Sequence, residues 1–314
     1  MASQAETDEN AGKLAPTGIR RALLLLNRKA RNGGAPIEAA LNMLRRGGIE
    51  IEEMSCERAA DLSRAVRKHA GSFDGVIVGG GDGTLNCAAP SLIETGLPLG
   101  ILPLGTANDL ARTLGIGADP VAAAEIIVAG HERRIDLGEV NGHPFFNVAS
   151  IGFSAELARE LTSDLKRRFG TLGYAMAGAR LLSRMRPFTA FIEYDGRTER
   201  VKTLQIAVGN GRHYGGGLTV DATAQPDDGV FHVYSLEVDH WWQLVALVPW
   251  LRRGTHGTWR DVRAFTTSEI TVRTRRTRSV NTDGELTSAT PAVFRILRGA
   301  VRVFAPQPGT SETK

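Results

Sequence analysis

Several residue types are scarce in this sequence, and each shortage excludes a class of protein. The chain has two cysteines, Cys56 and Cys87, which are too few for a disulfide framework and typical of a reduced, cytoplasmic protein. Neither has a second Cys or a His at the spacing of a metal-binding motif. No apolar run reaches about 18 residues, so no membrane-spanning helix is predicted. Residues 1–17 are polar and acidic, unlike a signal peptide.

The remaining composition is that of a globular protein, with 42% hydrophobic and 23% charged residues. A length of 314 residues favours two domains. The charge is uneven: residues 1–134 hold 15 basic and 16 acidic side chains, whereas residues 135–314 hold 23 and 18. A basic second half indicates an anionic partner, either nucleic acid or an acidic membrane surface. No zinc finger, RNA-recognition signature or basic repeat supports nucleic acid, so we expect none.

The first half of the chain alternates between apolar strands and amphipathic helices. This alternation predicts a parallel α/β domain over residues 18–134, after a disordered tail at 1–17. The first strand, R-R-A-L-L-L-L-N at 20–27, has the continuous apolar run of a strand that is buried on both faces. Further strands are predicted at 49–54, 76–78 and 99–102, and helices at 37–46, 59–70, 86–95 and 121–129.

The pattern changes after residue 134, where strands dominate. We predict a second, β-rich domain over residues 135–300, arranged as a sandwich, with 301–305 as a candidate strand of the first domain. Helices are expected only at about 155–185 and 240–252. The strands are predicted at 134–139, 143–150, 189–194, 203–209, 229–235, 269–273 and 292–296.

The most informative stretch is V-I-V-G-G-G-D-G-T-L-N at residues 76–86. It predicts a buried strand, then a glycine turn, then a helix. Glycines can adopt positive φ and let the backbone approach a ligand, so that successive N–H groups can hold a phosphate. Thr84 and Asn86 are expected to cap the helix. An ordinary strand-to-helix turn would use the same glycines, but Asp82 among them indicates a cation between this carboxylate and a phosphate.

A second strand-to-helix junction follows at residues 103–112, P-L-G-T-A-N-D-L-A-R. It contains Thr106, Asn108 and Asp109, while a loop rich in cations at 27–34 follows the first predicted strand. Because the carboxyl ends of parallel strands meet at one edge of a sheet, we expect these loops to face one crevice. The alternatives are a helix-capping Asp109 and a plain solvated loop at 27–34.

These motifs closely resemble those of the bacterial diacylglycerol-kinase-like lipid kinases. The pair G-G-G-D-G-T-L-N (79–86) and L-P-L-G-T-A-N-D-L-A (102–111) carries most of the likeness. Weaker matches follow in the same order: I-D-L-G at 135–138, I-G-F-S-A at 151–155, V-G-N-G at 208–211, G-G-G at 215–217, A-Q-P-D-D-G-V at 224–230 and D-G-E at 283–285. The resemblance implies an ATP- and magnesium-dependent kinase that phosphorylates a hydroxyl of a lipid such as diacylglycerol, on a fold shared with NAD kinases.

The resemblance also implies roles for single residues. Asp82, Asp109 and Asp136 would organise water and Mg²⁺ near the phosphates, although Asp136 could instead make an interdomain hydrogen bond. The positions that match the ATP-binding residues of the family are Asn27, Gly79, Gly80, Gly81, Asp82, Gly83, Thr84, Asn86, Gly105, Thr106 and Asn108. Those that match a second, structural magnesium site are Gln225, Asp228 and Val230. A capped Asp-Asp-Gly turn is the alternative for this second site.

The D-G-E motif carries the catalytic assignment that the resemblance implies. Its Glu is the proposed general base of the family, which is Glu285 here. Asp283 would orient Glu285 or the substrate hydroxyl, and Asp82 completes the catalytic set; a hydrogen-bonded turn is the alternative for 283 and 285. The chain departs from the family at Cys87, where a Glu is usual, and near Ser55, where the second strand usually ends in a Thr that touches the nucleotide.

Two other functions fit part of the sequence. An NAD-kinase-like phosphotransferase on a soluble substrate would share the Asp-Gly-Thr turn, and a nucleotide-binding regulator could have lost catalysis. The second is disfavoured because Asp82, Asp109 and Glu285 are all intact.

The stretch H-W-W-Q-L-V-A-L-V-P-W-L-R-R at 240–253 combines tryptophans, aliphatic residues and a basic end. Such a stretch is typical of a helix that lies on a membrane, although a core helix beside a solvated basic face has the same composition. We therefore expect a lipid substrate and a cytoplasmic protein in peripheral contact with an anionic membrane surface. A homodimer is compatible with the sequence.

Overall fold

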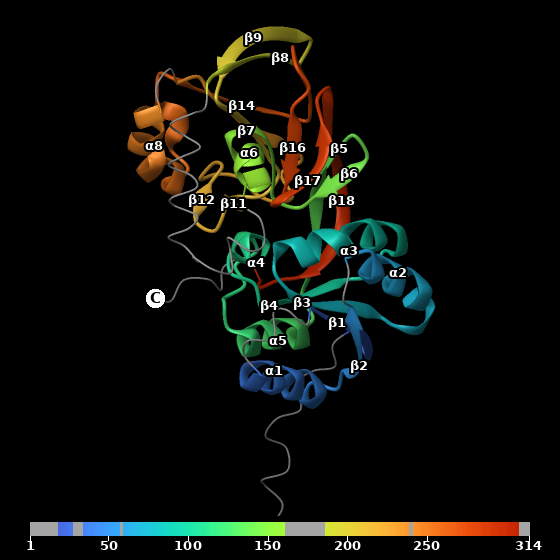
Figure 1. Cartoon of the computed structure of the whole chain (residues 1–314). Helices are drawn as coiled ribbons and strands as arrows, with labels where there is room; N and C mark the ends of the chain where they lie inside the picture. Colours follow the sequence, from blue (N-terminus) through green and yellow to red (C-terminus); the bar gives the residue numbers. More distant parts are fainter. Residues whose placement is uncertain (1–17, 28–33, 57–58, 161–185, 239–240, 308–314) are drawn as a thin grey trace, which may run out of the picture.

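A computed structural model of the chain describes residues 18–27, 34–56, 59–160, 186–238 and 241–307. It has two stacked domains, with helices on both faces of a sheet in the lower domain and mainly strands in the upper one (Figure 1). The lower domain is built on parallel strands and the upper one on two antiparallel sheets. The predicted fold class, a parallel α/β domain followed by a β-rich sandwich, is confirmed.

The first domain places its strands in the order β2-β1-β3-β4, all parallel. Every residue of β3 is buried, as its continuous apolar run requires of a strand covered on both faces. Helix α1 packs against α5 on one face of the sheet, and α2 packs against α3 on the other (Figure 1). The elements are β1 (Arg21–Asn27), α1 (Gly34–Arg46), β2 (Glu50–Cys56), α2 (Ala59–His69), η2 (Ala70–Ser72), β3 (Gly75–Gly80), α3 (Asp82–Thr95), β4 (Leu99–Pro103), α4 (Asp109–Thr113) and α5 (Pro120–Ala129).

The second domain packs two sheets face to face. One has the order β14-β13-β10-β7-β16-β17, and the other contains β5, β6, β18, β15, β8 and β9. Phe145 and Phe231, one from each sheet, stack with their ring centroids 6.1 Å apart in the shared apolar core. The strands are β5 (Glu132–Val140), β6 (His143–Phe145), β7 (Val148–Gly152), β8 (Phe188–Tyr194), β9 (Arg197–Thr203), β10 (Gln205–Gly209), β11 (His213–Tyr214), β12 (Leu218–Thr219), β13 (Phe231–Leu236), β14 (Val262–Thr267), β15 (Glu269–Thr274), β16 (Ser279–Thr282), β17 (Glu285–Ala289) and β18 (Ala292–Phe304).

Strand β18 runs through both domains and joins their sheets. Its first four residues, Ala292–Arg295, pair with β15, and its last residues enter the parallel sheet, where Val303 pairs with Leu99 of β4. Strand β5 follows β18 along most of this length, with an irregularity between Leu297 and Val301. The two domains therefore share a continuous hydrogen-bonded sheet. The boundary that we placed between residues 134 and 135 falls inside β5.

Several elements differ from the sequence prediction in ways that matter for the site. Helix α3 begins at Asp82 rather than at residue 86, because the Gly81 carbonyl already accepts helical hydrogen bonds from the N–H groups of Thr84 and Leu85. The strand predicted at 143–150 is two strands, β6 and β7. Strands β9, β14, β16 and β17 were not predicted because their polar and apolar residues do not alternate clearly. The helix expected from residue 155 is observed as α6 (Phe153–Glu160); residues 161–185, like the tail at 1–17, lie outside the described residues.

The outer face of the β7 sheet carries a third layer. Helix α8 (Trp241–Arg253) buries Leu244, Leu247 and Leu251 against this face, together with the β11–β12 hairpin and η3 (His256–Thr258). Strand β13 is therefore covered on both sides, with Val233 facing the sandwich core and Tyr234 the outer layer. None of the described helices is long and apolar enough to cross a membrane.

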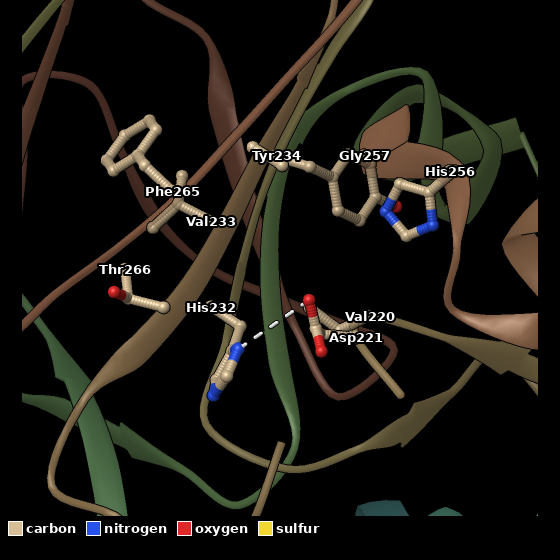
Figure 2. A pocket seen from close by; sticks show the side chains of 10 residues that line it. Val220, Asp221, His232, Val233, Tyr234, His256, Gly257, Phe265 and Thr266 are labelled. Carbon is tan, nitrogen blue, oxygen red and sulfur yellow. Dashed lines mark ion pairs between the residues drawn. The ribbon is translucent and has the colours of Figure 1, made fainter. Parts of the chain in front are cut away.

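A cavity of about 230 Å³ lies in this outer layer between β13, β14 and η3 (Figure 2). On one side His232 faces Asp221, with 4.0 Å between the imidazole Nδ1 and the carboxylate Oδ2. On the other side His256 packs edge-on against Tyr234 with ring centroids 4.6 Å apart. His256 is 1% exposed, and its Nδ1 has no hydrogen-bond partner among the described residues. Burial lowers the pKa of His256 to about 4, so this ring is neutral in the folded protein.

His256 should make the protein sensitive to acid. The imidazole has its ordinary pKa near 6.5 in the unfolded chain and about 4 when folded. The unfolded state therefore binds more protons between these values, and stability falls as the pH drops from about 6.5 to 4. The shift corresponds to a loss of about 3 kcal/mol. His256→Phe keeps an aromatic ring against Tyr234 and removes the titration. Unfolding free energies measured from pH 7 to pH 4 should therefore fall less in the variant; parallel curves would contradict the assignment.

Candidate active site

The glycine turn after β3 is packed directly against the loop after β4. A Cβ atom built on Gly81 would lie 3.1 Å from the Cα of Gly105, and one built on Gly105 would lie 2.4 Å from the Cα of Gly81. Two backbones thus touch where no side chain fits. Gly81 has φ −100, and Gly79, Gly80 and Gly83 also avoid positive φ. Of the two properties of glycine that we expected this turn to use, positive φ and close approach of the backbone, only close approach is observed.

Thr84 and Asn86 do not cap helix α3, contrary to our expectation. Gly81 is the N-cap residue, and both side chains lie buried within the helix. Thr84 packs on the turn, since a Cβ on Gly80 would lie 2.6 Å from its Oγ1. The Asn86 Oδ1 is buried and accepts no hydrogen bond from any described residue. The N–H groups of Asp82 and Gly83 precede the first intrahelical bond, so the helix start still presents donors and the positive end of its dipole.

The second loop is shaped by Asn108. This residue has a left-handed backbone with φ 50, and its side chain both accepts from the Gly105 N–H (2.9 Å) and donates to the Gly105 carbonyl (3.0 Å). Asn108 therefore holds Gly105 against Gly81, while Thr106 at the loop tip is exposed. Of the predicted nucleotide residues in this loop, only Thr106 is solvent-exposed.

Two carboxylates meet where the two loops face each other. The Asp82 Oδ1 accepts from the Leu110 N–H at 3.0 Å, which ties the first turn of α3 to α4. The buried carboxylate of Asp109 accepts from the Gly216 N–H at 3.0 Å and lies 3.7 Å from Nη1 of Arg112. Burial raises the pKa of Asp109 to about 6, the Gly216 hydrogen bond opposes this, and the charge of Asp82 adds to it. The predicted proximity of Asp82 and Asp109 is thus observed.

Asp136 does not join them. Its Oδ1 accepts from the Gly299 N–H (2.7 Å), its Oδ2 from the Gly229 N–H (2.9 Å), and its backbone is bonded to Pro226 and Asn210. Among the described residues, no three Asp, Glu, His or Cys side chains gather as metal ligands would. Asp136 therefore makes structural hydrogen bonds, as in the alternative that we named, but they join β5 to β18 and to the 225–230 turn within residues 135–300.

The turn at 225–230 is closed by Asp228. Its Oδ2 accepts from the Gln225 N–H at 3.0 Å and its Oδ1 from the Val230 N–H at 3.1 Å, while Nε2 of His232 lies 3.0 Å from Oδ2. Gln225 and Val230 thus each direct an N–H group at this carboxylate. This arrangement is the capped turn that the sequence left open, and a cation at Asp228 stays a prediction.

Asp283 lies at the tip of the β16–β17 hairpin with a left-handed backbone, φ 48. Its carboxylate accepts three backbone N–H groups, from Phe146 at 2.7 Å, Asn147 at 3.1 Å and Val148 at 3.0 Å. Burial raises the pKa of Asp283 to about 7, the three N–H groups oppose this shift, and the charge of Asp82 adds to it. Asp283 therefore fixes the hairpin on the turn between β6 and β7.

Glu285, two residues later, is brought to the first turn of α3. A Cβ on Gly83 would lie 3.4 Å from Oε1 of Glu285, so the carboxylate of the second domain touches the helix start of the first. Burial raises the pKa of Cys87 to about 11, and the charge of Glu285 contributes. Cys87, where the family usually has Glu, is therefore a protonated neighbour of this carboxylate. Leu286 beside it is an exposed apolar side chain.

For the remaining predicted positions, the structure describes only part of the backbone. Asn27 ends β1 in register with Cys56, one residue beyond the Leu26–Gly79 pair, so its backbone lies at the same sheet edge as the glycine turn. The side chains of Asn27, Ser55 and Cys56 and the loop 28–33 lie outside what the structure describes.

Sequence reasoning missed the donors that hold the acidic residues. These are the N–H groups of Gly216, on the β11–β12 hairpin, and of residues 146–148. The only signal was the G-G-G run at 215–217, whose glycines all have positive φ. Donor positions on distant backbone leave no mark in a sequence.

Comparison with known proteins decides the family. The model of the diacylglycerol kinase catalytic domain matches residues 21–140, and that of the YegS C-terminal NAD kinase beta sandwich-like domain matches residues 147–305. The chain belongs to the diacylglycerol kinase family.

Relatives and solved structures agree with this membership. A diacylglycerol kinase of Mycobacterium tuberculosis (strain CDC 1551 / Oshkosh) is 33% identical over 313 residues, covering 96% of this chain and 100% of the relative. One of Staphylococcus aureus (strain Newman) is 30% identical over 270 residues, covering 85% and 86%. A crystal structure of a diacylglycerol kinase from Bacillus anthracis str. Sterne superposes with a TM-score of 0.79 at 25% identity, covering 93% of this chain and 99% of that one. The protein is a kinase of this family, and its two domains imply a nucleotide substrate.

The contact between the two glycines gives a test of the nucleotide site. Gly81→Val places a branched side chain against Gly105 and must push the loops apart, so ATP affinity should fall by at least about tenfold. Gly117→Ala is the control, because a Cβ there meets no atom within 4 Å. Both are measured by calorimetric titration with ATP, after circular dichroism has verified folding. A folded Gly81→Val variant with the parent's ATP affinity would contradict the site.

Replacing Asp283 and replacing Glu285 should have different effects on the stability of the protein. Asp283→Ala leaves three part-buried N–H groups without their acceptor and should lower the free energy of unfolding by about 2–4 kcal/mol. Glu285→Ala removes an exposed side chain and should leave stability nearly unchanged. Urea unfolding at neutral pH measures both. Equal stability of the two variants would show that Asp283 does not anchor the hairpin.

Proposed function

We propose that the protein is an ATP- and Mg²⁺-dependent lipid kinase that phosphorylates a hydroxyl of a lipid such as diacylglycerol, with Glu285 as the general base. The observation that carries the proposal is the position of the Glu285 carboxylate, 3.4 Å from a Cβ built on Gly83. An acid from the substrate domain thus lies at the helix start where a nucleotide's terminal phosphate would be held. Such a position suits a base that deprotonates the attacking hydroxyl.

The two glycine loops supply the nucleotide site of this proposal. The N–H groups at the start of α3 can donate to phosphate oxygens, and the close Gly81–Gly105 contact leaves the backbone exposed to them. Thr106, exposed at the tip of the second loop, is positioned to add a hydroxyl. Asn108 acts indirectly, through its two hydrogen bonds to Gly105.

Asp82 and Asp109 fit a magnesium ion. Mg²⁺ is usually bound by one or two protein carboxylates together with waters and substrate phosphates, and two carboxylates are what the loops present. The charge of Asp82 adds to the raised pKa of Asp109, and a cation between the two carboxylates would relieve it. When bound, the ion would neutralise charge on the phosphates during transfer. Asp136 and Asp228 do not enter this proposal, because backbone N–H groups show them holding β18 and the 225–230 turn in place.

In this proposal, Asp283 and Glu285 have different roles in the transfer step. Asp283 holds the hairpin on residues 146–148, so that Glu285 points at the helix start. Glu285 accepts the proton of the acceptor hydroxyl as its oxygen attacks the terminal phosphorus of ATP, and ADP leaves. Leu286, exposed beside Glu285, offers an apolar contact that suits a lipid tail better than the phosphates and ribose hydroxyls of a dinucleotide. This supports a lipid acceptor over the NAD-kinase-like alternative.

A transfer assay separates the proposed functions. The purified protein is incubated with labelled ATP, Mg²⁺ and a panel that contains diacylglycerol, phosphatidylglycerol, sphingoid bases and NAD. Transfer to a lipid supports the proposal, transfer to NAD supports the soluble alternative, and ATP binding without transfer to any acceptor supports an inactive regulator.

Replacing the proposed base should remove turnover and leave ATP binding. Glu285→Gln keeps the size of the side chain and removes the proton acceptor, so the turnover number at saturating ATP and lipid should fall by about 10²–10⁴-fold. The affinity for ATP should change little, because the hydrogen bonds described within the two glycine loops do not involve Glu285.

The control is Glu269→Gln, an exposed glutamate of β15 in the same domain. It should keep the parent's turnover number. A Glu285→Gln turnover number within about threefold of the parent's would mean that Glu285 is not the base, since general-base assistance is typically worth far more.

A further inference from the structure

Helix α8 has an unusual outward face. Its inward side chains, Leu244, Leu247 and Leu251, are buried in the outer layer, as an amphipathic helix requires. The opposite side of a helix on a globular protein normally carries charged residues. Here, however, residues 241–251 include no charged residue at all, and Gln243 is the one strongly polar side chain among them.

Exposed large apolar side chains are concentrated on this face of α8. Five large apolar side chains are exposed in the described part of the chain, and four of them are on α8. They are Trp242 (56%), Val245 (54%), Trp250 (38%) and Val248 (37%). Four exposed side chains of this size within nine residues of one helix mark an interaction surface rather than a solvated helix.

The same face ends in positive charge. Arg252 and Arg253 close the helix, Arg260 follows after η3, and all three are exposed. Helix α8 contains no acidic residue. Tryptophan and aliphatic side chains bordered by arginines match the interface of an anionic bilayer, where aromatic rings lie at the headgroup level and cations meet lipid phosphates.

The helix is held rigidly. The Gln243 side chain donates to Oδ2 of Asp261 at 3.0 Å, and the hydroxyl of Thr219 donates to the Arg252 carbonyl at 3.0 Å. Trp250 packs edge-on against Trp259 with centroids 5.1 Å apart. The outward face is therefore a preformed surface.

We propose that this face of α8, defined by Trp242, Val245, Val248 and Trp250 with Arg252 and Arg253, docks the protein on an anionic phospholipid membrane. The proposal rests on the lipid-kinase function for its purpose, because a lipid acceptor is reached at a membrane. The docking face is also connected to the active site through the β11–β12 hairpin. In this hairpin, Thr219 donates to the Arg252 carbonyl and the Gly216 N–H donates to Asp109. Helix α8 and the nucleotide loops are thus connected by one short hairpin.

The chain carries its own reporter for this surface. Its four tryptophans are Trp241, Trp242, Trp250 and Trp259, all on α8 or shortly after it. Tryptophan emission therefore reports on this region alone. The parent protein, titrated with vesicles of equal parts phosphatidylglycerol and phosphatidylcholine, should shift its emission to shorter wavelength and sediment with the vesicles. Pure phosphatidylcholine vesicles should give a much weaker effect.

Two variants and one control test the two parts of the surface. Arg252→Glu with Arg253→Glu should lower the partition coefficient by at least about tenfold, because each basic residue near an anionic surface contributes a factor of about five. Val245→Gln with Val248→Gln should weaken it to a similar extent by removing the apolar contact. The control, Arg45→Glu with Arg46→Glu, makes the same charge change at the exposed end of α1, on the other domain (Figure 1). It should bind vesicles as the parent does.

The outcomes against the proposal are distinct. Equal binding of the parent to neutral and anionic vesicles, or equal loss in the control and the α8 variants, would overturn it. If the Val245/Val248 variant converts a dimer to a monomer in size-exclusion chromatography while its vesicle binding is unchanged, the face is an interface between copies of the chain. Phosphoryl transfer to lipid dispersed in detergent micelles should be unchanged in all variants, so failure of the docking proposal leaves the kinase proposal separately measurable.

Discussion

The site depends on the fixed relation between two domains, and strand β18 fixes it. Glu285 belongs to the sandwich and Gly83 to the α/β domain, so their contact survives only if the domains cannot rotate. Strand β18 restrains such a rotation by entering both sheets, with Val303 beside Leu99 at the parallel end. Asp136 holds β5, β18 and the 225–230 turn together beside this junction, because each of its carboxylate oxygens accepts an N–H from a different segment. A continuous sheet is stiff along its strands, which suits a site assembled from both ends.

The acidic residues around the site differ in role because they differ in what surrounds them. The carboxylates of Asp283 and Asp136 accept hydrogen bonds from backbone N–H groups and hold loops and strands in place. Asp82 makes one backbone hydrogen bond and lies close enough to Asp109 and Asp283 to raise the pKa of both. Glu285 is exposed. The exposed Glu285 is therefore the acid among them that a substrate can reach most directly.

The sequence predicted the nucleotide loops well and the second domain less well. Buried parallel strands and glycine turns are local signals, so β3, β4 and their loops were found from residues 76–86 and 103–112. Strands β16 and β17 have mixed polar and apolar residues and were missed. Their hairpin is held instead by the bonds from Asp283 to residues 146–148, and such distant pairings leave no periodic pattern.

By itself, the sequence determined the fold class, the two glycine loops and the acidic residues, because these follow from short-range patterns of burial and turn formation. Tertiary structure decided which acids meet. It paired Asp82 with Asp109, sent Asp136 to the junction of β18, and closed the 225–230 turn on Asp228. It also turned Trp242 and Val245 of α8 outward. The physical reason is the same each time: a side chain's role depends on which backbone donors and apolar surfaces the folded chain brings to it, and those come from residues far away in sequence.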